Sequence, residues 1–219
     1  ENVNRFLRNL SIEDNPAAFI ASSVLDMCQS LNKNKAGDDT TVLVIKIREQ
    51  ETINLFTGPP KNPENDYAII EKILSSEGKV VVCGGTTANI VARTLNCEIE
   101  FDMSTMTSTL PPIGKIPRIE LVTEGVITIN KALSLMKGYM YNNFNHRLLK
   151  LLYEKNGAAM LAKLLIEDCD NLNIWLGQAV NPAHQDTKFP MGFDFKTGQI
   201  KELASLMEKM GKIVTIHYI

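Results

Sequence analysis

The sequence predicts an α/β protein: a three-layer domain with a parallel or mixed sheet, preceded by a shorter segment of helices and one strand. Two observations support this fold class. From residue 52 onward, short apolar β-branched runs alternate with amphipathic helical patterns, which is typical of a sheet with helices packed on its faces. In addition, the 219 residues are 44% hydrophobic and 22% charged, the composition of an ordinary globular protein.

The first fifty residues are expected to form two helices and a strand. Apolar side chains recur at helical spacing near the N-terminus: Val3, Phe6, Leu7 and Leu10. Pro16 suits the first turn of a second helix. Residues 40–47 (TTVLVIKI) form the strongest β-branched run of the chain and predict a strand. The composition changes at 48–51, where we expect a boundary between domains 1–48 and 52–219.

The second domain is expected to alternate strands and helices. Strands are predicted at 52–56, 79–83, 97–102, 119–123, 171–177 and 212–218. Helices are predicted at 66–75, 87–95, 127–137, 142–154, 158–167 and 197–210. The segments 104–117 and 180–196 are predicted to be irregular connections, and long connections in compact domains are often functional.

Charge and cysteine usage exclude several classes of partner. The net charge is −2 and no long basic run is present, so we expect no binding to nucleic acid. The four scattered cysteines are typical of reduced, buried thiols in a cytoplasmic protein. No apolar run reaches the roughly 18 residues that span a bilayer, so we expect no membrane insertion.

The most informative motif is Val80–Ile90 (VVVCGGTTANI), in which a buried strand is followed by two glycines, two threonines and a helix. Glycine lets a backbone approach a ligand closely, and a helix N-terminus offers unpaired N–H groups with a partial positive charge. We therefore expect Gly84, Gly85, Thr86, Thr87 and Asn89 to bind a phosphate or carboxylate group. The alternative is a tight Gly-Gly turn with a threonine that only caps the helix. Cys83, at the end of the strand, is expected to be a core residue and not a nucleophile.

Two further polar groups follow predicted strands. Thr123 and Glu124 come at the end of one strand, and Asn181 and His184 lie in the irregular segment after another. Because ligands bind outside the carboxyl ends of the strands in open α/β sheets, we expect these residues to share one crevice with the Gly-Gly turn. The alternatives are a surface turn at Glu124 and a polar loop around His184.

Asp38 and Asp39 precede the predicted strand at 40–47. Adjacent carboxylates at a strand edge can bind hard cations such as magnesium or manganese. A binuclear site needs more carboxylates from other strands, and residues 1–48 supply too few. The alternative is a pair of solvated side chains in a polar loop.

The segment from Phe19 to Ile47 combines a helix (FIASSVLDMCQSL), a polar loop and GDDTTVLVIKI. It resembles the C-terminal end of a metal-dependent serine/threonine protein phosphatase of the sporulation stage II protein E (SpoIIE) type. In that family the D-D-x-T motif opens one of the last strands of a β-sandwich. The resemblance implies that Asp38 is a metal ligand and that Asp39 and Thr40 support the turn. Residues 1–48 would then be a remnant of the phosphatase domain, because the upstream Asp-Gly motif and the other metal-binding aspartates have no counterpart here.

The rest of the chain is similar to an accessory α/β domain that follows the phosphatase in a subset of these bacterial proteins. The similarity runs through NLFTGPP, VVCGGTTANIVARTL, ELVTEGVITINKAL and GQAVNPAHQ. The resemblance implies a longer parent protein that uses manganese or magnesium to hydrolyse phosphoserine or phosphothreonine on a phosphorylated partner protein. Because the sequence begins at Glu1 and not at a methionine, we expect it to be part of such a chain and inactive as a phosphatase by itself.

For the domain at 52–219 we expect a regulatory role in which a small anionic ligand binds at residues 84–89, with Glu124 and the loop 181–184 nearby. Two alternatives remain open. One is an independent enzyme that acts on a sugar phosphate or nucleotide with Glu124 as its base. The other is a protein-interaction module or a homodimer contact. Its candidate apolar residues are the methionines Met103, Met106, Met136, Met140 and Met160.

Overall fold

A computed structural model describes residues 2–10, 15–31, 39–141, 146–179 and 193–219. The chain divides into two compact units. The first comprises Glu1–Glu49 and Phe144–Leu149, and the second comprises Gln50–Asn143 and Lys150–Ile219. The division at residues 49 and 50 falls where the sequence composition changes, whereas the inclusion of 144–149 in the first unit had no signal in the sequence.

The first unit contains helices α1 (Asn2–Asn9) and α2 (Ala17–Leu31) and the beginning of α6 (His146–Leu152). Pro16 precedes α2 as expected, and its carbonyl accepts a hydrogen bond from the Ile20 amide at 3.1 Å. Ile20 and Val24 are buried on one side of the helix. The positions of the two helices thus follow from the helical spacing and the proline.

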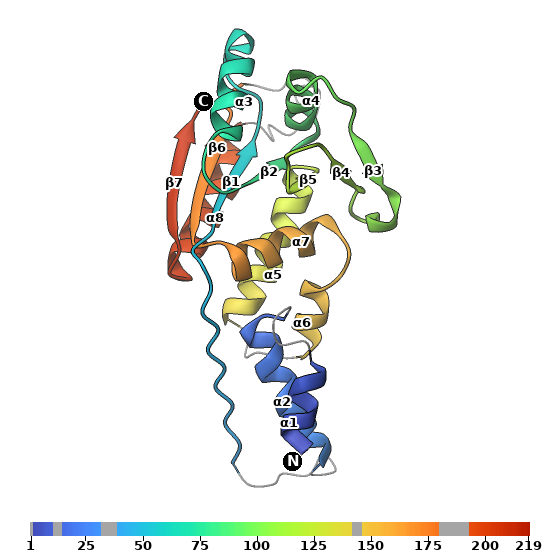
Figure 1. The fold of residues 1–219 in the computed structure, drawn as a ribbon. Helices are drawn as coiled ribbons and strands as arrows, with labels where there is room; N and C mark the ends of the chain where they lie inside the picture. The colour runs from blue at the N-terminus through green and yellow to red at the C-terminus, as the bar shows by residue number, and fades with distance from the viewer. Residues whose placement is uncertain (1, 11–14, 32–38, 142–145, 180–192) are drawn as a thin grey trace. The chain divides into compact units, whose positions relative to one another are not determined.

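The strand predicted at 40–47 is wrong. Residues 39–51 contain no helix or strand, although they run as an extended chain (Figure 1). A strand exists only where a neighbour accepts and donates its backbone hydrogen bonds, and no described strand pairs with this segment. Its β-branched composition favours an extended backbone, but a β-strand also needs a neighbouring strand that pairs with it.

In the described residues, seven strands form one mixed sheet in the order β3-β4-β5-β2-β1-β6-β7. Their bounds are β1 (Thr52–Thr57), β2 (Lys79–Cys83), β3 (Glu100–Asp102), β4 (Ile113–Lys115), β5 (Leu121–Thr123), β6 (Asn171–Leu176) and β7 (Ile213–Tyr218). Strands β5, β2, β1, β6 and β7 are parallel to one another, and β4 is antiparallel to both β3 and β5. The order reverses at β1, since β2 and β5 extend the sheet on one side and β6 and β7 on the other.

The helices of the second unit lie on both faces of this sheet, which confirms the predicted three-layer α/β class (Figure 1). The helical segments are η1 (Pro63–Asn65), α3 (Asp66–Leu74), α4 (Gly85–Thr94), η2 (Met103–Thr105), α5 (Val126–Tyr141), α7 (Gly157–Lys163), η3 (Leu164–Asp168) and α8 (Phe193–Lys209). Helices α3 and α4 pack on one face, and α5, α7 and α8 pack on the other.

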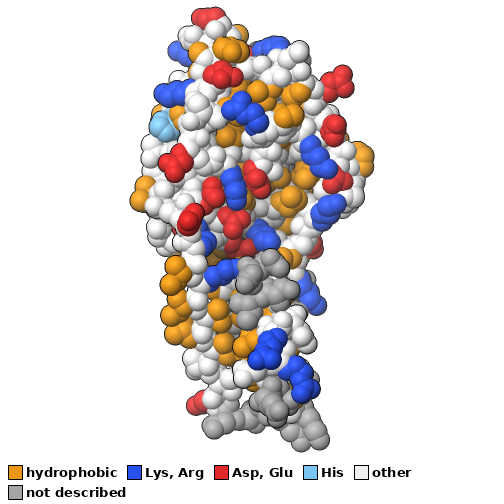
Figure 2. Space-filling view, viewed as in Figure 1, with side chains coloured by type: hydrophobic (Ala, Val, Ile, Leu, Met, Phe, Trp, Pro, Cys, Tyr) orange, Lys and Arg blue, Asp and Glu red, His pale blue; other side chains and the backbone are white. Residues whose placement is uncertain are grey.

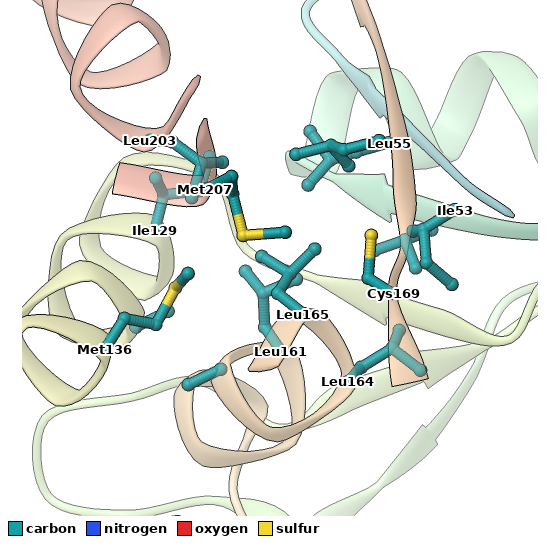
Figure 3. Close-up of a cluster of buried hydrophobic side chains, with 14 of the residues drawn as sticks. Ile53, Leu55, Ile129, Met136, Leu161, Leu164, Leu165, Cys169, Leu203 and Met207 are labelled. Carbon is teal, nitrogen blue, oxygen red and sulfur yellow. The ribbon is translucent and has the colours of Figure 1, made fainter. Parts of the chain in front are cut away.

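The larger core lies between the sheet and the layer of α5, α7 and α8, and Figure 3 shows its side chains converging from all of these elements. Fully buried members include Ile53 and Leu55 of β1, Met136 of α5, Leu165 of η3 and Met207 of α8. Each such side chain stabilises the fold by roughly 1.5–3 kcal/mol relative to an exposed position. This face therefore carries much of the stability of the second unit.

The opposite face of β1 holds a buried polar residue. Asn54 is fully buried, and its Oδ1 accepts hydrogen bonds from Trp175 Nε1 and Asn173 Nδ2, both at 3.2 Å. Its Nδ2 donates to the carbonyl of Glu77 at 2.9 Å. Because every polar atom of the amide is paired, its burial carries little penalty and holds β1, β6 and the start of β2 together.

The segment expected to be irregular at 104–117 contains β4, which pairs with β3 in a short antiparallel extension of the sheet. This arm carries exposed apolar side chains, Phe101, Met103 and Met106. Of the other methionines considered for an interaction surface, Met136 is buried in the core, and Met140 and Met160 pack against it.

Candidate functional site

A cavity of about 120 Å³ lies at the carboxyl ends of β1, β2 and β5. The residues that line it come from the turns after these strands and from the first turns of α4, α5 and α8: Thr57, Gly58, Pro59, Cys83, Gly84, Gly85, Thr86, Thr87, Glu124, Gly125, Val126, Ile129, Lys196 and Gln199. In open α/β sheets ligands bind outside the carboxyl ends of the strands, close to where the strand order reverses. Since the order reverses at β1, the cavity occupies that position.

The N-terminus of α4 forms one wall. Gly84 has a φ of 126°, which favours glycine, and its amide donates to the carbonyl of Thr123 at 2.8 Å. No side chain caps α4, and within the described chain the amides of Gly85, Thr86 and Thr87 have no acceptor. These free N–H groups at the positive end of a ten-residue helix can bind an anion.

Thr87 has a structural role in this wall. Its side chain is buried, and its Oγ1 accepts a hydrogen bond from the Gly58 amide at 2.9 Å. This bond joins the first turn of α4 to the turn after β1, so it holds two sides of the cavity together. Thr86, in contrast, is exposed and lines the cavity, and its hydroxyl and amide have no hydrogen-bond partner among the described residues.

Glu124 caps the N-terminus of a second helix, α5. Its Oε2 accepts hydrogen bonds from the amides of Ile127 at 3.1 Å and Thr128 at 3.3 Å, at the beginning of α5. The carboxylate therefore neutralises the positive end of α5 and leaves α4 as the uncapped helix of the pair. A base already engaged by two amides is poorly placed to abstract a proton, which weighs against the expected enzymatic role of Glu124.

Lys196, in the first turn of α8, brings a positive charge to the cavity. Its side chain is half-buried, and burial lowers its pKa from the ordinary value of 10.5 to about 8. No ion pair or hydrogen bond to Lys196 is present among the described residues. A methyl group added at Gly58, whose φ is +85°, would overlap Lys196 Nζ, so this glycine is what lets the ammonium reach the end of β1.

Gln199, one helical turn further along α8, is 5% exposed. Its Nε2 donates to the carbonyl of Val126 at 3.2 Å, whereas its Oε1 is buried and has no donor among the described residues. A buried acceptor without a partner is unusual in a native protein, and this one belongs to a side chain that lines the cavity.

Cys83 forms the floor and is chemically inert. It is fully buried, and burial raises the pKa of its thiol to about 12. The thiol therefore stays protonated near neutral pH and is no nucleophile, as expected for a core residue. The Thr123 hydroxyl lies 3.4 Å from this sulfur and donates to the carbonyl of Glu124 at 2.8 Å.

The structure brings together most, but not all, of the residues predicted to bind a ligand. Gly84, Gly85, Thr86, Thr87 and Glu124 line the same cavity. Thr123 and Asn89 do not, because the Thr123 hydroxyl is directed to the backbone and Asn89 is exposed further along α4. Asn181 and His184 lie outside the described residues.

The contributions of β1 and α8 to the cavity were not predicted from the sequence. Thr57, Gly58 and Pro59 follow a correctly predicted strand, so the glycine and proline there were a usable signal. Lys196 and Gln199 carry no local signal, since they reach the cavity only through the packing of α8 against α5 and the sheet.

The predicted metal ligands have a different outcome. Asp38 lies outside the described residues, and Asp39 is exposed. Within the described ranges, no three His, Cys, Asp or Glu side chains come close enough to hold a metal ion. The role of Asp38 and Asp39 as metal ligands stays a prediction.

The charged side chains of the visible face are mixed in sign. Figure 2 shows Lys and Arg side chains interspersed with Asp and Glu over the visible face, without a large patch of one sign. Every helix in the described part of the chain is too short or too polar to cross a lipid bilayer.

No family model, curated protein or solved structure matches this chain.

Proposed function

We propose that the second unit, Gln50–Asn143 and Lys150–Ile219, is a regulatory domain that binds a small anionic ligand in the cavity at the end of β1. One observation carries the proposal: the Lys196 ammonium, which has no acidic partner in the described chain, lines the same small cavity as the uncapped N-terminus of α4.

The physical reason is the cost of an unpaired charge. Burial disfavours the charged form of Lys196, which is why its pKa falls. An anion in the cavity would offset that cost by pairing with the ammonium and by accepting hydrogen bonds from the free amides of α4. The ammonium of Lys196 and the free amides of α4 together favour a ligand of negative charge in this cavity.

The state of the groups that could act in catalysis supports binding without turnover. The Cys83 thiol is protonated, Glu124 caps α5, and no histidine is among the described lining residues. The alternative of an independent enzyme on a sugar phosphate or nucleotide is favoured by one feature, the lowered pKa of Lys196, because an amine of this kind can act as a base near neutral pH. Release of phosphate or another product, followed by ³¹P NMR, would separate the two functions.

We further propose that this domain belongs to a cytoplasmic protein phosphatase of the SpoIIE type that acts on a phosphorylated protein with manganese or magnesium. Support comes from residues 40–47, where Leu43, Ile45 and Ile47 are 81%, 78% and 94% exposed on an extended segment that pairs with no described strand. A strand that completes a larger β-sandwich would have this appearance in the absence of its neighbours. The ligand would then regulate the phosphatase.

The proposal is tested by titrating sulfate into the chain and into two lysine variants. Lys196→Met keeps the length of the side chain but removes its charge, and we expect sulfate to bind at least about tenfold more weakly, as is typical for a lost charge-assisted hydrogen bond. Lys201→Met removes an exposed charge from the same helix and serves as the matched control.

Calorimetry gives the affinities, and far-UV circular dichroism shows that the variants are folded. Equal sulfate affinity of Lys196→Met and the unaltered chain would contradict the proposed site. An absence of saturable binding by sulfate and phosphate alike would contradict the proposed function.

A further inference from the structure

The sheet of the second unit ends in two edge strands, β3 and β7, that differ in length and charge. β3 is three residues long (EFD), and two of its side chains are carboxylates. β7 is six residues long (IVTIHY), as long as β1 and β6, and it contains no Asp, Glu, Lys, Arg, Pro or Gly. Short length, charges and prolines are the usual means by which an edge strand avoids pairing with another chain. β3 has two of these features and β7 has none.

The outer edge of β7 offers backbone groups for pairing. The amides of Ile213 and Ile219 donate to carbonyls at or next to the two ends of β6, both at 3.0 Å. Because successive residues of a strand direct their backbone groups to opposite edges, every second residue between these two also faces β6. The N–H and C=O groups of Val214, Ile216 and Tyr218 therefore point to the outer edge, where no described strand pairs with them (Figure 1).

We propose that β7 pairs with β7 of a second copy of this chain, antiparallel to it and about a two-fold axis at Ile216, so that the two sheets become continuous. A two-fold axis brings identical edges together in opposite directions. In the register centred on Ile216, this residue lies opposite Ile216 of the second copy, and Val214 lies opposite Tyr218. All outward backbone groups of β7 are then used, with two hydrogen bonds for each of these pairs. The inference does not depend on the proposed ligand.

The side chains that meet in this register are compatible with one another. Thr215 lies opposite His217 of the second copy, and Ile213 lies opposite Ile219. Burial lowers the pKa of His217 from its ordinary value of 6.5, so its imidazole is uncharged near neutral pH and no like charges face each other. Ile213 and Tyr218 are 64% and 52% exposed, so pairing removes apolar surface from water. A second copy therefore fits this edge.

The oligomeric state of the full 219-residue chain tests the proposal. We expect sedimentation equilibrium at a series of protein concentrations to give a mass that approaches twice the 24.4 kDa of one chain. Thr215→Lys places two ammonium groups diagonally across the axis, and we expect it to raise the Kd of the dimer at least about tenfold. Thr41→Lys adds the same charge at another exposed threonine, in the segment 40–47, and is the matched control.

Far-UV circular dichroism shows whether both variants are folded. A monomer at every concentration, or an unchanged Kd in folded Thr215→Lys, would overturn the inference. A dimer that is weakened by Thr41→Lys and not by Thr215→Lys would also overturn it, and would assign the contact to residues 40–47.

A cysteine at the axis tests the register without relying on a loss of binding. The two Cα atoms of a hydrogen-bonded antiparallel pair lie about 5.5 Å apart, within the range that a disulfide spans. We therefore expect Ile216→Cys to form a disulfide-linked dimer on mild oxidation. Tyr218→Cys is the control, because in this register its two copies are separated by four residues, roughly 13 Å along the strands.

Peptide mass spectrometry identifies the linked residues and distinguishes them from the four native cysteines. Because Tyr218 is more exposed than Ile216, accessibility alone would favour linkage at 218. Linkage at 216 and not at 218 is the expected result. Linkage at 218 alone, or at neither position, would overturn the proposed pairing of β7.

Discussion

Residues 40–47 (TTVLVIKI) and β1, Thr52–Thr57 (TINLFT), are both extended and rich in β-branched side chains, but only β1 belongs to a sheet. β1 pairs on both sides, with β2 and β6, and its Ile53 and Leu55 are fully buried. In residues 40–47, alternate side chains are 78–94% exposed. The difference shows that β propensity describes a fit to a pleated, buried surface and needs that surface to take effect.

Removing one apolar side chain from each segment is the most direct test of this difference. Leu55→Ala leaves a cavity in the larger core and is expected to lower the free energy of unfolding by about 2–5 kcal/mol. Ile45→Ala alters an exposed side chain and is expected to change it by no more than about 0.5 kcal/mol. Urea denaturation measures both, with far-UV circular dichroism for the whole chain and Trp175 fluorescence for the second unit.

Trp175 is the only tryptophan of the chain and lies buried in β6 beside β1, so its fluorescence reports the sheet specifically. A destabilisation by Ile45→Ala as large as that by Leu55→Ala would show that residues 40–47 are packed in solution. The distinction between a segment that belongs to the sheet and one that pairs with no described strand would then be wrong.

The same contrast explains how much of the fold the sequence could predict. Strand β2 was predicted with its observed bounds, because Val80–Cys83 is a continuous apolar run that is buried on both faces and Lys79 precedes it directly. Strand β4 was missed, since Ile113–Lys115 is three residues long, follows two prolines and takes its structure from β3 and β5. A local sequence pattern carries no information about pairing with distant residues. For this reason a strand was predicted wrongly at 40–47 and β4 was missed.

The candidate site follows the same rule. The Gly-Gly turn and Glu124 were predicted, because a strand followed by glycine and a helix marks the edge of a parallel sheet in the sequence itself. Lys196 and Gln199 were not, because they lie more than a hundred residues from Gly84 along the chain and join it only when α8 packs on the sheet. The amides of α4 that line the cavity were therefore predicted from the sequence, and the two side chains of α8 were not.

A second prediction concerns how sulfate binding depends on pH, and it compares Lys196 with Lys46. Lys196 lies in the cavity at the end of β1, whereas Lys46 lies in the exposed segment, where its Nζ donates to the Asn15 carbonyl at 3.0 Å. Sulfate stays dianionic above pH 6, so its affinity reports the charge of the protein. With a pKa of about 8 for Lys196, we expect affinity to be level below pH 7 and to fall about tenfold between pH 7 and pH 9 as the ammonium loses its proton.

The effect of pH on the stability of the fold has the opposite sign. Because folding lowers the pKa of Lys196, the unfolded chain binds more protons between about pH 8 and 10.5, and the contribution of this group to stability rises with pH in that window. We expect Lys196→Met to remove the pH dependence of sulfate binding and Lys46→Met to leave it unchanged. A fall in affinity that persists in Lys196→Met would assign the titration to another group.

The smallest expected effect concerns a single backbone hydrogen bond at the start of α4. Gly85 occupies the first helical position, its φ is not positive, and a Cβ there would meet no atom within 4 Å. Proline is tolerated at this position and removes the amide proton, whereas alanine keeps it. We therefore expect Gly85→Pro to bind sulfate about three- to tenfold more weakly than Gly85→Ala, the value of one hydrogen bond.

Calorimetry at pH 7 measures this difference, and Trp175 fluorescence in urea shows whether the two variants are equally stable. The comparison isolates the amide, because both substitutions add a side chain at the same exposed position. If the two variants bind equally, the anion is held by Lys196 alone. The uncapped N-terminus of α4 would then be an ordinary exposed helix end.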